Sequence, residues 1–464
     1  MRVTLLGHAS VLVELEGVRC LMDPVFQDPF QEGALVSCPK REVDADALGP
    51  LDVLLLTRAH LDHFDIPTLA RLPRTVDVIC PKDHAIAYVL QQLGYTNVHP
   101  TEAMSLVPYK GTQLLMSRSH VAHAMEFGVI FKDRSGAFWN QVDTVLAPDT
   151  IQASLDQAGR IDLLFSMYAS QSFDFFEGRS SGFPHATHAM NLSNVLAIRP
   201  KMVVPASAGF RFDGPFAWSN AFLFPVSREL FIEDLARLDP EIGATVADPG
   251  DVFEIEGGEV RRLPGASALA RTVEEDTSLL AYDPTSSIPP LADPNPDGYS
   301  SDKIAKAVDA CFDGLTSFVV ASYTKPDPVI DEHRQHGATY AVAVVMPDGG
   351  ARWLRVELGA LLPSFTTGTG PMPAAAVVHR IAGSALAAWT LREKSYFYFR
   401  GFSRKFSTFH VVAQRDGKVV VEPRPLPDLL GHYLLRKAPG ADMALKQRLD
   451  LQLRPYLGAA AARV

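Results

Sequence analysis

The first 260 residues alternate between short apolar runs and segments in which apolar residues recur every three or four positions. Short apolar runs bounded by polar residues are typical of strands, and the longer spacing is typical of amphipathic helices. We predict strands at Met1–Leu6, Val11–Leu15, Arg19–Met22, Val53–Leu56, Gln113–Met116, Val129–Phe131, Ala137–Trp139 and Lys201–Pro205. We predict helices at Ala85–Leu93, Thr150–Gln157, Asn191–Ile198 and Arg228–Leu238.

The run Val53–Leu56 is apolar at every position, as expected for a strand that is covered on both faces. Helices on the outside of two stacked sheets would supply that cover. The pattern therefore predicts an α+β domain whose sheets are covered by helices.

Beyond residue 280 the pattern changes. Residues 281–298 are rich in Pro, Ser and Asp and predict a linker, which separates a domain of residues 1–280 from a smaller C-terminal α+β domain of residues 299–464. In the C-terminal domain we expect helices at Ser301–Val319 and Ala374–Leu391, strands at Tyr340–Met346, Arg352–Leu358 and Lys394–Arg404, and His333 at the surface. No motif in it predicts a role.

The most informative polar positions follow the run Val53–Leu56. Thr57-Arg58-Ala59-His60-Leu61-Asp62-His63 places two imidazoles and a carboxylate within four residues. Zinc, iron and manganese accept this mixture of nitrogen and oxygen ligands. The alternative is a helix N-terminus at which both histidines are exposed.

Further polar residues follow other predicted strands. Asp23 ends one strand, His120 and His123 follow another, and Asp143 follows the pair at residues 129–139. His8 lies in the turn Gly7–Ser10, where it either faces a metal pocket or satisfies backbone groups of its turn. Glu126 is either a carboxylate ligand or a solvated residue at a strand edge.

In this order, the motifs resemble those of the metallo-β-lactamase superfamily, which implies an αββα sandwich with metal ligands on loops at one edge. The resemblance assigns metal ligation to His60, Asp62, His63, His120 (or His123) and Asp143, the last as a bridging carboxylate. It assigns to Asp23 the bracing of the His60–His63 loop. Arg58 stands where the family has its first histidine, and the family's last histidine has no counterpart, although His185 and His188 are candidates for that place and for substrate contact.

Several loops resemble one branch of the superfamily, the CMP-sialic acid hydroxylase type. They are Asp143-Thr144, Ser181-Gly182-Phe183-Pro184, Pro205–Phe210 and Pro249-Gly250-Asp251. The resemblance covers roughly residues 1–260. That branch carries a Rieske module with two Cys and two His ligands, whereas Cys20, Cys38, Cys80 and Cys311 lie far apart here. An oxygenase of this kind would need an external electron donor.

Arg58 is the main departure from the family pattern, and it has three interpretations. The guanidinium holds an anionic group of the substrate as a bidentate partner, or its presence leaves a site for one metal ion, or the site is degraded and without catalysis. We assign catalytic roles to Asp62 and Arg58, with Arg58, His185 and His188 as substrate-binding candidates.

Composition narrows the function further. Of the 464 residues, 47% are hydrophobic and 21% charged, which is ordinary for a globular enzyme. The net charge of −10 argues against nucleic-acid binding, and no apolar run reaches the roughly 18 residues of a membrane span. Scattered cysteines and a strand pattern from the first residue predict a reducing, cytoplasmic location.

The sequence therefore predicts a metal-dependent enzyme, and it narrowly favours an oxygenase with one or two iron ions that acts on a small polar substrate. The alternative is a zinc or manganese hydrolase of an ester, amide or phosphodiester. A third interpretation is a non-catalytic binding protein with a degraded site. The sequence makes no prediction of the oligomeric state.

Overall fold

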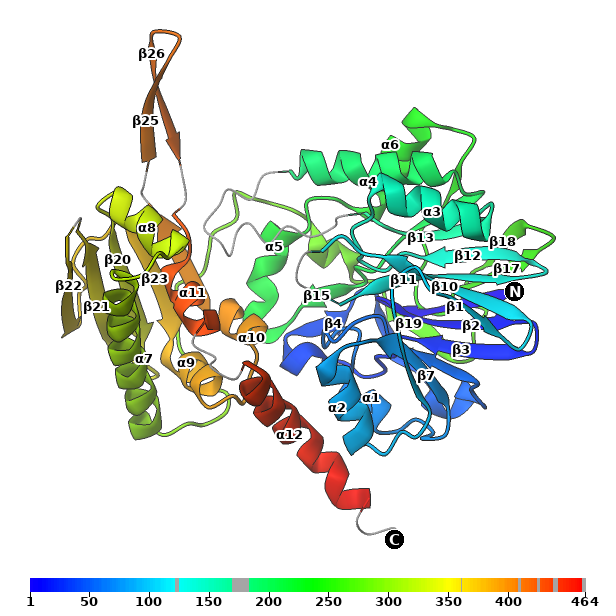
Figure 1. Cartoon of the computed structure of the whole chain (residues 1–464), viewed down its shortest axis with the longest axis horizontal. Coiled ribbons are helices and arrows are strands. Elements are labelled where there is room, and N and C mark those ends of the chain that lie inside the picture. The colour runs from blue at the N-terminus through cyan, green and yellow to red at the C-terminus, as the bar shows by residue number, and fades with distance from the viewer. Residues whose placement is uncertain are drawn as a thin grey trace. The chain divides into compact units, whose positions relative to one another are not determined.

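The computed structural model describes residues 1–121, 125–168, 183–359, 361–407, 410–423, 426–436 and 441–460. The chain forms two compact units (Figure 1). Unit 1 comprises residues 1–172, 182–284 and 452–464, and unit 2 comprises residues 173–181 and 285–451. Within the described residues, no helix combines the length and apolar character that a membrane crossing requires.

Unit 1 contains two large sheets. The eight-stranded sheet has the order β18 (Glu259–Leu263), β17 (Val252–Glu256), β1 (Arg2–Gly7), β2 (Ser10–Leu15), β3 (Val18–Met22), β6 (Val53–Leu55), β7 (Asp77–Pro81), β8 (Val98–Thr101). The seven-stranded sheet has the order β16 (Gly243–Ala244), β14 (Met202–Ala206), β13 (Leu163–Met167), β12 (Gly136–Asn140), β11 (Phe127–Asp133), β10 (Thr112–Arg118), β9 (Leu106–Tyr109). Two small antiparallel pairs are β4 (Leu35–Ser37) with β15 (Phe210–Phe212) and β5 (Lys40–Val43) with β19 (Ala270–Glu274).

Helices flank these sheets on both outer sides (Figure 1). They are α1 (Ile66–Leu69), α2 (His84–Gln92), α3 (Pro148–Ala158), α4 (His185–Ile198), α5 (Asn220–Leu223) and α6 (Arg228–Leu238). Figure 1 shows α3, α4 and α6 outside the seven-stranded sheet and α1 and α2 outside the eight-stranded sheet.

Alternation of side chains along the strands builds the two layers of core. In β10, Leu114 and Met116 pack between the sheets, whereas Leu115 packs under the helices. In β11, Val129 packs between the sheets and Ile130 packs under the helices. Successive residues of a strand point to opposite faces, so a strand covered on both sides is apolar throughout. The predicted αββα sandwich is confirmed.

Strand direction brings the polar loops to one edge. β1 and β2 are antiparallel, as are β2 and β3, whereas β3 and β6 are parallel. β1, β3 and β6 therefore run the same way, and their carboxyl ends meet. His8, Asp23 and the segment 57–63 follow these three ends directly.

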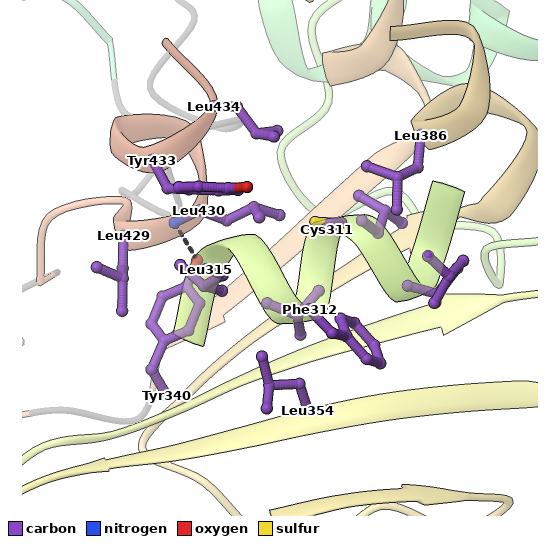
Figure 2. Close-up of a cluster of buried hydrophobic side chains, with 14 of the residues drawn as sticks. Cys311, Phe312, Leu315, Tyr340, Leu354, Leu386, Leu429, Leu430, Tyr433 and Leu434 are labelled. Atoms are coloured by element: carbon purple, nitrogen blue, oxygen red, sulfur yellow. Dashed lines mark hydrogen bonds between the residues drawn. The ribbon is translucent and has the colours of Figure 1, made fainter. Parts of the chain in front are cut away.

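Unit 2 is an α+β structure around a sheet with the order β22 (Pro363–Thr369), β21 (Ala351–Leu358), β20 (Thr339–Val345), β23 (Val377–Ala382), β24 (Ser403–Ser407). Its other elements are α7 (Ser301–Ser322), α8 (Pro328–Gln335), α9 (Gly383–Thr390), α10 (Tyr396–Gly401), the hairpin β25 (His410–Arg415) and β26 (Lys418–Pro423), and α11 (Leu429–Arg436). The chain continues into α12 (Ala441–Ala460). Figure 2 shows α7 and α11 packing their apolar side chains over this sheet.

Three expectations in this part of the chain were wrong. Residues 374–391 form β23 and then α9, because β-branched Val377, Val378 and Ile381 favour a strand. Residues 396–401 form helix α10, which Ser395 caps by accepting a hydrogen bond from the backbone N–H of Tyr398. A run of consecutive aromatic residues carries no periodicity that separates strand from helix. His333 is fully buried instead of exposed.

Candidate metal centre

Three side chains converge at the shared edge of unit 1. One ligand atom each from His8, Asp62 and His63 lies within 4.8 Å of the others. His8 Nε2 is 3.3 Å from Asp62 Oδ2, and His63 Nε2 is 3.8 Å from the same oxygen. Both histidines are buried, and Asp62 keeps 20% of its side chain exposed. The group therefore lies at the base of an opening toward solvent.

Asp23 fixes the orientation of His63. His63 Nδ1 is 2.8 Å from Asp23 Oδ2, and Asp23 also accepts hydrogen bonds from the backbone N–H and the hydroxyl of Thr57. Donation from Nδ1 leaves Nε2 directed at Asp62 and Asp143, with no hydrogen-bond partner among the described residues. A carboxylate that orients an imidazole in this way is the usual second layer of a metal site. Asp23 thus contacts both Thr57 and His63, at the two ends of the loop whose bracing the family resemblance assigns to it.

His8 enters the group from the turn between β1 and β2. Its backbone φ of 46° is left-handed. Gly209 lies so close that a Cβ on Gly209 would be 2.8 Å from the backbone nitrogen of His8. Burial lowers the pKa of His8, more than the nearby carboxylates raise it. The ring is therefore neutral near pH 7, and neither of its nitrogens has a hydrogen-bond partner among the described residues.

Arg41 ties the two loops that carry His8 and Asp23. Its guanidinium donates to the carbonyl oxygens of Leu6 and Val25, the latter at 2.5 Å. Leu6 precedes the His8 turn, and Val25 follows Asp23. Buried hydrogen bonds from a charged group hold these backbones in fixed register.

Arg58 lies beside the group and forms ion pairs with two carboxylates. Its Nη1 is 2.7 Å from Glu126 Oε2 and its Nη2 is 2.6 Å from Asp143 Oδ1. The side chains of Arg58 and Glu126 are 3% and 1% exposed, and Ser119 donates a hydrogen bond to the other oxygen of Glu126. Glu126 is thus neither solvated nor in the group of three ligands. With both carboxylates in place, the guanidinium is an internal counter-ion.

The carboxylates of the centre stay ionised. Burial alone would raise the pKa of Asp62 and of Asp143, but their cationic neighbours outweigh burial and hold both values below the usual range. For His63, burial lowers the pKa, yet Asp143 and Asp62 outweigh it and raise the pKa to about 9. The centre as it stands therefore favours added positive charge.

These residues fit one divalent cation. Two imidazole nitrogens without hydrogen-bond partners and an ionised carboxylate face a common point, and buried polar atoms without partners are costly unless a ligand satisfies them. Four carboxylates, Asp23, Asp62, Glu126 and Asp143, lie in this region, and the two guanidinium groups described above, Arg58 and Arg41, do not balance their charge. A 2-His-1-carboxylate set binds iron, and a similar set binds zinc.

The other predicted ligands that the structure describes are not members of this group of three. His60 is exposed, and its carbonyl oxygen accepts the backbone hydrogen bonds of His63 and Phe64. Its ring is not part of the group of three. His120 Nε2 is 2.9 Å from Thr150 Oγ1, so its ring is bound to the start of α3. His123 lies outside the described residues. Asp143 adjoins the group, with Oδ1 3.3 Å from His63 Nε2.

The two histidines of α4 are not brought to this centre. His188 Nε2 is 2.9 Å from Asp234 Oδ2 of α6, and its ring packs against Phe183 and Phe231. That pair joins α4 to α6. His185 is exposed at the first residue of α4, beside Phe183.

His8 is the residue that motif spacing alone missed as a ligand, because it lies 52 positions before the run at residues 60–63. The signal that finds it is strand direction. A histidine after β1 reaches the same edge as the loops after β3 and β6 once the β1–β2–β3 meander is recognised.

Comparison with known proteins agrees with this architecture. Residues 2–166 match the model of the Beta-lactamase superfamily domain. This part of the chain is therefore a metallo-β-lactamase superfamily domain, as the sequence motifs predicted.

Among individual relatives, a UPF0173 metal-dependent hydrolase of Salinibacter ruber is 28% identical over 127 residues, 27% of this chain and 50% of that protein. The chain spans half or less of the length of the curated relatives it matches. Two solved structures are also similar to this chain. An isothiocyanate hydrolase from Delia radicum gut bacteria has a TM-score of 0.42, 14% identity and coverage of 55% and 100% of the two chains. CmlA, a diiron β-hydroxylase from Streptomyces venezuelae, has a TM-score of 0.38, 17% identity and coverage of 57% and 54%. The CMP-sialic acid hydroxylase-type branch stays a prediction.

Proposed function

We propose that unit 1 is a metal-dependent hydrolase that holds one divalent cation, zinc or manganese, through His8, Asp62 and His63. The observation that carries the proposal is the convergence of two unpartnered imidazole nitrogens and one ionised carboxylate at a partly open edge. The name of the Salinibacter ruber relative, a metal-dependent hydrolase, supports the same chemistry. The substrate class is an ester, amide or phosphodiester.

A bound cation of this kind lowers the pKa of a water molecule and polarises a carbonyl or phosphoryl oxygen. The protein supplies orientation around it. Asp23 holds the His63 ring so that Nε2 faces the centre. Asp143 stays ionised because Arg58 holds its pKa below the usual range. Its carboxylate would therefore accept a hydrogen bond from a water molecule at the centre and orient it.

The contacts of Arg58 explain why we propose a centre with one metal ion instead of two. Its guanidinium lies against Asp143, the carboxylate that the family resemblance assigns to a metal bridge. A permanent charge at this place pairs with both Asp143 and Glu126 without any metal. Substrate binding by Arg58 then requires that it leave one of these carboxylates, and the proposal assigns it no such role.

A second candidate function is an iron oxygenase. The specific observation in its favour is the ligand set, because two histidines and one carboxylate are typical of non-haem iron oxygenases. This function requires an electron donor from outside the chain. A small polar substrate and an external donor stay predictions under it.

The test is elemental analysis of the full chain purified without added metal and after reconstitution. We expect about one equivalent of zinc or manganese, and His63→Ala should lower the content at least tenfold while leaving the circular dichroism unchanged. His99→Ala is the matched control, because His99 is an exposed histidine of unit 1 that pairs with Asp77. Metal at 100 times its dissociation constant should stabilise the wild type by about 2.7 kcal/mol.

Activity then separates the two functions. Hydrolysis of p-nitrophenyl acetate or bis(p-nitrophenyl) phosphate that is lost in His63→Ala supports the hydrolase. Iron as the native metal, with oxygen uptake in the presence of a chemical reductant and no hydrolysis, would transfer the assignment to the oxygenase. Absence of bound metal after reconstitution would refute both functions and favour the binding protein.

A further inference from the structure

A cavity of about 270 Å³ opens beside His8 within unit 1. Its walls come from the end of β1, the segment 205–209 after β14, the residues 224–230 that lead into α6, and the turn at residues 277–282. Because His8 belongs both to the cavity wall and to the metal-binding group, a molecule in the cavity lies next to the candidate centre.

Ser207 is the second polar feature of the wall. It is 4% exposed, has a left-handed φ of 64°, and its hydroxyl has no hydrogen-bond partner among the described residues. A buried hydroxyl without a partner is unfavourable in the free protein. A residue other than glycine held in this backbone region is also strained, and such strain is concentrated at functional sites. Both features indicate that Ser207 serves a ligand.

Arg228 and Glu229 are the Arg and Glu side chains of the wall, and Arg228 Nε lies 3.9 Å from Glu229 Oε1. Arg228 donates to Asp248 at 2.7 Å and to the Ala247 carbonyl at 2.9 Å, so its charge is already neutralised. The rest of the wall is largely apolar, with Leu5, Phe224 and Val226 among its members. In the metal-free chain, enclosing an ionised group against such a wall would therefore be costly, because the guanidinium of Arg228 is already paired.

We infer that this cavity binds the substrate of the proposed hydrolase, and that the substrate is an uncharged, mainly apolar small molecule with one hydrogen-bonding group at Ser207. That the ligand is a substrate rests on the proposed function, whereas the chemical class of the ligand rests on the cavity itself. It departs from the small polar substrate predicted from sequence. The volume fits a molecule the size of a bicyclic aromatic alcohol rather than a larger cofactor.

Isothermal titration with two probes of equal size tests the ligand class. The probes are 2-naphthalenemethanol, which is uncharged, and 2-naphthoate, which carries a carboxylate. The metal-free full chain should bind the alcohol at least about tenfold more tightly than the acid. Metal is removed for this titration because a bound cation beside His8 would itself attract the carboxylate.

Three variants locate the binding. Ala281→Trp narrows the cavity at an exposed position of its wall and should abolish binding of the alcohol. Ala266→Trp is the matched control at an exposed alanine outside the cavity and should bind as the wild type does. Ser207→Ala keeps the backbone but removes the hydroxyl, and should weaken binding about fivefold, as the loss of one neutral hydrogen bond implies.

The outcomes separate the inference from the proposed function. Equal or tighter binding of 2-naphthoate, or unchanged affinity in Ala281→Trp, would overturn the ligand class even if the protein holds metal and hydrolyses esters. Competitive inhibition of p-nitrophenyl acetate hydrolysis by 2-naphthalenemethanol in the metal-loaded chain supports the cavity as the substrate pocket. Non-competitive behaviour would overturn that role while leaving the hydrolase intact.

Discussion

Each unit of this protein buries histidine beside aspartate, but the two arrangements differ in what they leave unpartnered. In unit 2, Asp428 Oδ1 accepts hydrogen bonds from the Tyr340 hydroxyl at 3.0 Å and from the backbone N–H of Gly431 at 3.0 Å. His379 Nδ1 lies 3.3 Å from the same oxygen, and His379 Nε2 is the one ring nitrogen of this network without a hydrogen-bond partner among the described residues. The Leu430 N–H in turn donates to the Tyr340 hydroxyl (Figure 2). This network attaches α11 to strands β20 and β23.

The unit 1 centre is built differently. There, His8 Nε2 and His63 Nε2 both lack a hydrogen bond among the described residues, although they lie close together around Asp62. Burial of a histidine and an aspartate is therefore insufficient to identify a site. The distinguishing features are several unpartnered ligand atoms at one point, an excess of carboxylates over cations, and placement on loops at the ends of strands.

The largest effect that tests this comparison is expected at Arg58. Arg58→Met leaves Glu126 and Asp143 buried without their cation, which should destabilise metal-free unit 1 by about 3–5 kcal/mol. The measurement is urea unfolding in the presence of a chelator. If metal binding supplies the missing charge, excess zinc should recover part of that loss.

Arg58→His is the companion variant. It restores an imidazole where the superfamily motif has one. The zinc content per chain after reconstitution, measured by elemental analysis, should therefore rise from one equivalent toward two. A stoichiometry that stays at one would show that nuclearity is not set by this residue. Unchanged stability of Arg58→Met would contradict the role of Arg58 as an internal counter-ion.

The next effect concerns Asp428 in unit 2. Asp428→Ala removes both the Tyr340 hydrogen bond and the cap on Gly431, and should destabilise unit 2 by about 2–3 kcal/mol. Metal content should not change, because this network holds structure together and binds no ion. Asp302→Ala is the control: Asp302 is an exposed residue of α7, paired with Lys306, and its loss should cost less than about 0.5 kcal/mol. Loss of metal in Asp428→Ala would contradict the view that the Asp428 network is structural and that the metal binds in unit 1.

Local pattern predicted sheets covered by helices, whereas the αββα sandwich followed from the resemblance of the motif order to a known superfamily. Continuous apolar strands such as Val53–Leu56 required cover on both faces, and the motif at residues 60–63 drew attention to Asp62 and His63. Asp23 ends a strand, and the same resemblance assigned to it the bracing of that loop. These features require no knowledge of distant contacts beyond the order of strands.

What the sequence did not predict depends on which side chains meet in space. The partners of Arg58 lie 68 and 85 positions later in the chain, at Glu126 and Asp143, so its role as an internal counter-ion is invisible in the motif. His120 follows a strand as a ligand would, yet its ring binds Thr150. His333 looked like a surface residue because its neighbours in sequence are charged, whereas helix α8 turns that one position inward.

His333 gives the smallest and most specific effect, a dependence of unit 2 stability on pH. Its ring is fully buried, and Nε2 donates to the Pro427 carbonyl at 2.8 Å. Burial lowers the pKa of His333 below its ordinary value of 6.5, so the folded state resists the proton that the unfolded chain takes up. Stability contributed by the neutral ring is therefore present above about pH 6.5 and is lost as the pH falls below it.

We expect the free energy of unfolding of unit 2 to fall by about 1 kcal/mol more in the wild type than in His333→Gln between pH 7.5 and 5.5. Glutamine keeps a donor for Pro427 but does not titrate, so the difference between the two proteins isolates the imidazole. Urea unfolding at the two pH values, followed by tyrosine and tryptophan fluorescence, measures it. His336→Gln leaves the buried ring in place and should retain the wild-type loss, whereas an equal loss in His333→Gln would show that another group of unit 2 carries the pH dependence.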